Sequence, residues 1–160
     1  MKKLIIIFLI LLLCFGSCEA TAYKNSLSCK DITYSLQDEL TGYENYKEYG
    51  EADVGAIIRS DNLYDSCSVI YSVSSDDIGE IGIFHASNEA DIDQLLEESL
   101  DHIKALKDEK QEFLRNYLPD ELIKLNYADA RAFGNYVVYT VLAADESEEV
   151  FSFVQKLLSK

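Results

Sequence analysis

The stretch from Glu80 to Tyr117 constrains the fold most strongly, because it joins a short apolar segment to a long amphipathic one. The segment 81–86 predicts a strand, which a polar turn separates from a long helix. Pro119 is expected to end this helix, since proline cannot continue helical hydrogen bonding. The apolar residues of the helix recur at helical spacing, so one side of it must lie on a sheet. They are Ile92, Leu95, Leu96, Ile103, Leu106, Phe113, Leu114 and Tyr117.

Alternation and turn residues place the other elements around this unit. A helix is expected over 31–40, and a closing helix from Asp145, where Glu148 completes a capping-box pair. Gly134-Asn135 predicts a two-residue hairpin. Strands are expected over 68–73, 81–86, 127–133 and 136–142. The order α-β-β-α-β-β-α predicts an α+β domain with a four-stranded antiparallel sheet and helices packed on one face.

The N-terminus predicts export. A basic start precedes an unbroken apolar run over 4–15, which is 12 residues long. Such a run is too short for a helix to cross a hydrocarbon layer of roughly 30 Å, and it is typical of a secretory signal peptide. Phe15-Gly16-Ser17-Cys18 resembles the lipobox of bacterial lipoproteins, although Phe15 replaces the usual leucine. Ala20-Thr21-Ala22 is a competing site, whose cleavage would release a soluble secreted protein beginning at Tyr23.

Cys18 is the favoured processing site, because it stands just after the apolar run and a thiol there has no other evident use. The predicted organisation is a lipoprotein signal peptide over 1–17, a lipid-anchored tether over 18–28 and a single α+β domain over 29–160. A diacyl anchor at Cys18 is enough for stable membrane attachment. The expected location is therefore the extracytoplasmic face of the cell membrane, with secretion as the alternative.

The charge balance excludes one class of partner. The chain has 29 acidic and 14 basic residues, a formal charge of −15. Loss of the signal peptide would leave 12 basic residues against 29 acidic ones, a formal charge of −17. Such a surface repels phosphates, and no basic stripe offsets it, so we expect no nucleic-acid binding.

Two cysteines of the predicted domain are disulfide candidates. Cys29 and Cys67 would close a loop of about 38 residues and stabilise the fold by roughly 4 kcal/mol on the chain-entropy model. The alternative is two free thiols, one exposed near the tether and one in a strand. Their Cα separation decides between these outcomes. Two cysteines and two scattered histidines do not match a zinc site, so neither a metal nor a cofactor is expected.

The histidines offer little catalytic chemistry. His85 lies near a strand end beside a turn, and with a nearby acid it is the only candidate for an envelope enzyme of unknown reaction. His102 lies in mid-helix and is expected to be an exposed i,i+4 partner of Glu98. No catalytic residue is assigned, and a non-enzymatic protein is favoured.

Tyrosines crowd the irregular stretch 43–65, where only a short helical turn over 54–58 is expected. Exposed rings there would stack on an unknown glycan or protein partner. The alternative is that they pack this half of the chain onto the sheet, since tryptophan is absent. The residues of this candidate binding surface are Tyr43, Tyr46, Tyr49 and Tyr64.

Four segments occur in the order of a known family over roughly the last 95 residues. They are Glu80-Ile-Gly-Ile-Phe84, Asn116-Tyr-Leu-Pro-Asp120, Gly134-Asn-Tyr-Val-Val138 and Asp145-Glu146. With them the chain resembles a family of small Firmicutes lipoproteins that is classified only as a domain of unknown function. The resemblance implies the fold and the lipoprotein location, and it implies no activity. We therefore expect a membrane-anchored binding or accessory module, with a secreted effector or inhibitor as the alternative.

Overall fold

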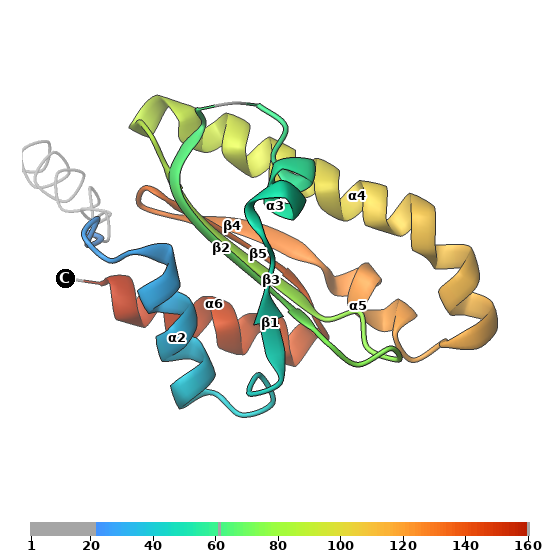
Figure 1. The fold of residues 1–160 in the computed structure, drawn as a ribbon. Coiled ribbons are helices and arrows are strands. Elements are labelled where there is room, and N and C mark those ends of the chain that lie inside the picture. The colour runs from blue at the N-terminus through green and yellow to red at the C-terminus, as the bar shows by residue number, and fades with distance from the viewer. Residues whose placement is uncertain (1–21, 61, 160) are drawn as a thin grey trace, which may run out of the picture.

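The computed structural model describes residues 22–60 and 62–159, which form a sheet between two layers of helices (Figure 1). The predicted signal peptide and the predicted lipidation site at Cys18 lie outside the described residues. The elements follow one another as α2 (Cys29–Glu39), β1 (Tyr46–Glu48), α3 (Glu51–Ile57), β2 (Tyr64–Ser72), β3 (Glu80–Ala86), the 3-10 turn η1 (Glu89–Asp91), α4 (Ile92–Tyr117), α5 (Leu122–Tyr127), β4 (Asp129–Phe133), β5 (Tyr136–Val141) and α6 (Ala144–Leu158).

The sheet is antiparallel and confirms the α+β class, but it has five strands in the order β1-β2-β3-β5-β4. The prediction of four strands was wrong because β1 has only three residues, with Tyr46 paired to Ser72 and Glu48 to Ile70. So short a segment shows no readable alternation. It becomes a strand through its pairing with the longer β2.

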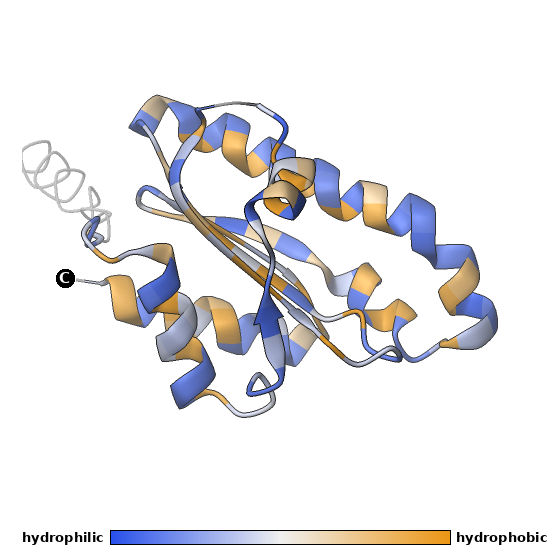
Figure 2. Cartoon of the chain, in the orientation of Figure 1, coloured by the Kyte–Doolittle hydropathy of each residue, from blue (hydrophilic) through white to orange (hydrophobic). Residues whose placement is uncertain are grey.

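Helices cover both faces of the sheet, so the prediction of helices on one face was also wrong. The α2 and α6 helices pack on one face, and α3, α4 and α5 pack on the other. The central strands explain this arrangement, since all six residues of β5 are buried. A strand that is apolar on both sides needs a covering layer on each. Figure 2 shows these hydrophobic strands between helices whose outer sides are hydrophilic.

The long helix ends at Tyr117 before Pro119, as predicted. Two of its residues expected in the core are instead exposed, since Phe113 is 56% and Tyr117 71% accessible. Figure 1 shows the reason: this end of α4 runs past the edge of the sheet. Its last turns therefore have no sheet beneath them.

The closing helix begins one residue before the predicted start, and its cap differs. The Glu146 side chain accepts a hydrogen bond of 3.0 Å from the Ala143 backbone nitrogen. Glu148, expected in a capping box with Asp145, instead forms an ion pair with Arg131 of β4. Several acids lie in the first turns of α6. Glu148 pairs with Arg131 of β4, and Glu146 caps the helix.

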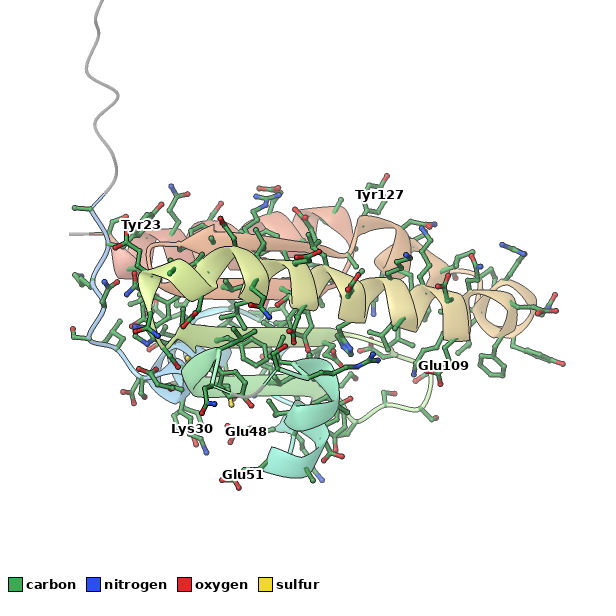
Figure 3. The ribbon with its side chains drawn as sticks, turned by 90° about the horizontal axis from the view of Figure 1, so that it is seen from above. Tyr23, Lys30, Glu48, Glu51, Glu109 and Tyr127 are labelled. Atoms are coloured by element: carbon green, nitrogen blue, oxygen red, sulfur yellow. The ribbon has the colours of Figure 1, made fainter. Side chains whose placement is uncertain are left out.

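The predicted tether over 18–28 is partly docked onto the domain. Tyr23 forms a β-bridge with Ser159, and the Lys24 backbone nitrogen donates to the Leu158 carbonyl at 2.7 Å. The Tyr23 ring also packs edge-on against Phe133, 6.2 Å between centroids. Figure 3 places Tyr23 at one end of the molecule and Glu109 of α4 toward the other. The chain is thus fixed to the domain from Tyr23 onward.

Candidate functional site

A buried carboxylate at the start of β3 forms the centre of the candidate site. The Glu80 Oε1 atom lies 2.7 Å from His102 Nε2 and 2.7 Å from the Tyr139 hydroxyl. Its Oε2 atom accepts a hydrogen bond of 3.0 Å from the Tyr49 hydroxyl. The partners belong to α4, to β5 and to the turn between β1 and α3. One carboxylate therefore joins four parts of the chain, and we call these residues the Glu80 cluster.

The surroundings of the Glu80 cluster fix the protonation states of its carboxylate and its tyrosines. Burial raises the pKa of Glu80, but the hydrogen bonds from His102, Tyr139 and Tyr49 lower it more, so the pKa lies below its ordinary value of 4.5. Burial and the neighbouring Glu80 raise the pKa of Tyr139 well above its ordinary value. At neutral pH the carboxylate is ionised and the tyrosines are neutral donors. An ionised carboxylate only accepts hydrogen bonds, so His102 Nε2 must carry a proton.

Gly82 makes room for the cluster. It lies two residues after Glu80 on the same face of β3, where it pairs with Tyr139 of β5. A Cβ atom at this position would overlap the Tyr139 ring. The absent side chain lets the ring lie flat across β3 and brings its hydroxyl to Glu80.

His102 was expected to be exposed beside Glu98, and that prediction was wrong. Its side chain is only 13% accessible and points to the sheet. Glu98 is engaged elsewhere, accepting hydrogen bonds from the backbone nitrogens of Arg59, at 2.8 Å, and Ser60, at 3.1 Å. Glu98 and His102 do lie one helical turn apart, but each side chain bonds to a distant segment of the chain instead of to the other.

Three neighbouring hollows follow α4 around the Glu80 cluster, and we call them together the α4 trough. The first, of about 350 Å³, is lined by His102, by the cations Arg59 and Lys104, and by the acids Glu98, Asp101 and Asp108. The middle one, of about 220 Å³, shares His102 with the first and lies beside α3. The third, also about 220 Å³, shares Tyr49 and Glu80 with the middle one and contains Lys110, so we call it the Lys110 hollow. Figure 3 shows α4 with α3 beside it, the two helices that border the middle hollow.

His85 lies on the opposite face of the sheet from the trough. Its Nδ1 atom is 2.7 Å from Asp65 Oδ1, and its ring packs edge-on against Tyr136 at 4.7 Å. Its Nε2 atom is buried and has no hydrogen-bond partner among the described residues. The acid expected near this histidine is present, but no hydroxyl or thiol is hydrogen-bonded to Nε2 to act as a nucleophile.

Cys29 and Cys67 are free thiols in the structure. The side chains of Ser66 and Ser68 in β2 bond to α2, so Cys67 between them faces the other layer, where it packs against the α4 side of the core. Cys29 starts α2, and its thiol donates to the Ser66 carbonyl at 3.3 Å. Cys29 is fully buried rather than exposed, and burial raises its pKa to about 12.

The four candidate tyrosines do not form one surface. Tyr43 is only 4% accessible and packs edge-on against Tyr46 on the side of α2 and α6. On the side of α4, Tyr49 stacks on Tyr71 at 4.3 Å and Tyr64 packs against Phe84. The expected binding surface is therefore corrected: these rings pack both faces of the sheet. Of the four, Tyr49 also lines the α4 trough.

Within residues 22–60 and 62–159, no group of three or more His, Cys, Asp or Glu side chains is placed to hold a metal ion. No helix in the described part of the chain is long and apolar enough to cross a membrane. Comparisons with known protein families, with curated proteins and with solved structures find no match for this chain. The resemblance to Firmicutes lipoproteins thus stays a prediction.

Proposed function

We propose that this protein is a lipid-anchored binding module of the cell envelope, attached through Cys18 and binding its ligand in the α4 trough. The observation that carries this proposal is the trough itself, built over the Glu80 cluster. Convergent polar side chains beside an apolar hollow are the usual composition of a ligand site. Glu80 is already bonded to three partners from its own chain, so it is not free to act as a base. Binding rather than catalysis therefore fits the site best.

The docking of Tyr23 defines how an anchored domain would lie. Five residue steps separate Cys18 from Tyr23, and they span at most about 18 Å when fully extended. The end of the domain with Tyr23 and Ser159 would face the bilayer closely. The far end of α4, a helix of 26 residues and about 39 Å, would point away from the membrane, and the trough would lie along the side.

A secreted binding protein or inhibitor is the second candidate. The small-residue site Ala20-Thr21-Ala22 directly precedes Tyr23, the first residue bonded to the domain. Cleavage there would release a domain with almost no free N-terminal chain. The trough would then bind the same ligand in a diffusing protein.

Intact mass and membrane fractionation of the full chain, expressed in a Gram-positive host, test the anchor. We expect the wild type in the membrane fraction with the mass of a chain that begins at diacylglyceryl-Cys18. The Cys18→Ala variant should lose this mass and leave the lipoprotein pathway, whereas Cys14→Ala is the matched control and should behave as the wild type. A soluble wild-type product that begins at Tyr23 would contradict the lipid anchor and support the secreted binding protein.

A further inference from the structure

Lys110 is a partly buried cation without an acidic partner. It lies on the core-facing side of α4, between Leu106 and Leu114 one turn away on either side. The positions three and four residues from it hold no acid, so helical spacing offers it no ion pair. Among the described residues it forms no salt bridge, in a chain with twice as many acids as bases. Its charge in the Lys110 hollow is therefore not neutralised by a protein group in contact.

The acids that line the same hollow are already engaged. Asp77 Oδ1 accepts from Lys124 Nζ at 2.5 Å and from the Gly79 backbone nitrogen at 2.7 Å. Glu80 is bonded within its own cluster. The hydroxyls of Tyr71 and Ser75, which also line the hollow, have no hydrogen-bond partner among the described residues. The Ser72 hydroxyl, which lines the hollow too, is hydrogen-bonded to Asp77 and accepts from the Ser74 backbone nitrogen at 3.3 Å. The side-chain groups left for a ligand are therefore one ammonium and two hydroxyls.

The apolar part of the Lys110 hollow comes from α4, α5, β5 and the loop before β3. It consists of Leu106, Leu125, Val141 and Ile78, and Tyr49, Ser72 and Gly79 complete the lining. The hollow has a volume of about 220 Å³. A cavity of roughly 150 Å³ is known to hold benzene, so this one has room for a ring or a short chain with one polar group.

These features together assign a ligand class to the site, and this assignment rests on the proposed function of the trough. We propose that the Lys110 hollow binds a small organic carboxylate. Its anionic group would pair with the Lys110 ammonium and accept from the Tyr71 and Ser75 hydroxyls. Its apolar body would lie against Leu106 and Leu125. A neutral molecule of the same shape would leave the Lys110 charge unpaired and bind more weakly.

Isothermal titration of the full chain in phospholipid nanodiscs tests this ligand class, with benzoate as the probe, benzamide as its neutral analogue and empty nanodiscs as the blank. We expect benzoate to bind the wild type at least tenfold more tightly than benzamide. Lys110→Met should remove that preference. Lys107→Met is the matched control, because Lys107 lies one turn earlier on α4, is also partly buried and does not line the hollow. It should keep the full preference.

Three results would overturn the assignment: no benzoate binding by the wild type, equal binding of benzoate and benzamide, or the same loss in both lysine variants. Lys110→Gln serves as a second variant if Lys110→Met alters the melting temperature. The two proposals fail separately. A processed membrane-anchored protein that ignores benzoate contradicts the ligand class alone, whereas a soluble protein beginning at Tyr23 that binds benzoate contradicts the anchor alone.

Discussion

Replacing Glu80 by Gln tests whether the Glu80 cluster holds the α4 trough together. The substitution keeps the size of the side chain but removes its charge and turns one acceptor oxygen into a donor. A hydrogen bond to a charged group contributes about 1.5–3 kcal/mol, against about 1 kcal/mol for a neutral one. Three bonds converge on this carboxylate. We therefore expect Glu80→Gln to lower the free energy of unfolding by about 2–4 kcal/mol at neutral pH.

Urea unfolding followed by circular dichroism measures this difference, since the chain has no tryptophan to report by fluorescence. At roughly 3 °C per kcal/mol, the melting temperature should fall by about 6–12 °C. Glu97→Gln is the matched control, because Glu97 is an exposed carboxylate on α4. It should change stability by less than about 0.5 kcal/mol.

The pH dependence gives the same experiment a second readout. The pKa of Glu80 is lowered in the folded protein, so its stabilising effect is complete above the ordinary value of 4.5 and is lost as the pH falls through the folded pKa. The gap between wild type and Glu80→Gln should therefore narrow only below pH 4.5. A stability difference under 1 kcal/mol at neutral pH, or one that stays constant down to pH 3, would show that the ionised Glu80 carboxylate does not stabilise the fold.

Three further predictions concern packing and thiols. Gly82→Ala should destabilise the fold by about 1–3 kcal/mol, because its Cβ displaces the Tyr139 ring. Gly55→Ala in α3 has open space and should be neutral or stabilising in thermal unfolding. Because Cys29 is buried, it should react with iodoacetamide only after denaturation. Non-reducing peptide mapping should find it unlinked to Cys67, and a disulfide-linked peptide would contradict the structure. Tyr43→Ala should lower the free energy of unfolding by about 3–5 kcal/mol, since the ring is buried. An unchanged midpoint of urea unfolding would mean that the ring does not stabilise the fold and would support its place in the candidate binding surface.

Local signals in the sequence predicted much of the fold. The α+β class, the stop of α4 before Pro119 and the hairpin at Gly134-Asn135 each depend on residues close together in the chain. Gly134 has the positive φ of 61° that such a turn needs at its first position. Periodicity and turn chemistry are enough for features of this kind.

The rest depends on contacts between distant segments, which local patterns do not encode. The β1 strand exists through its pairing with β2, and the second helical layer follows from the burial of β3 and β5 on both faces. The candidate site is the clearest case, since Glu80 and His102 are 22 residues apart and Tyr139 is 59 residues from Glu80. The one local signal was Glu80 itself, an acid that directly precedes the apolar segment 81–84 of its strand.

A crystal structure with bound 4-bromobenzoate would show whether the Lys110 hollow of the α4 trough is the ligand site. The anomalous signal of bromine locates the ligand without ambiguity. We expect one bromine between α4 and α5, near Leu125, with the carboxylate against Lys110. An empty hollow, or bromine only at other places on the surface, would contradict it.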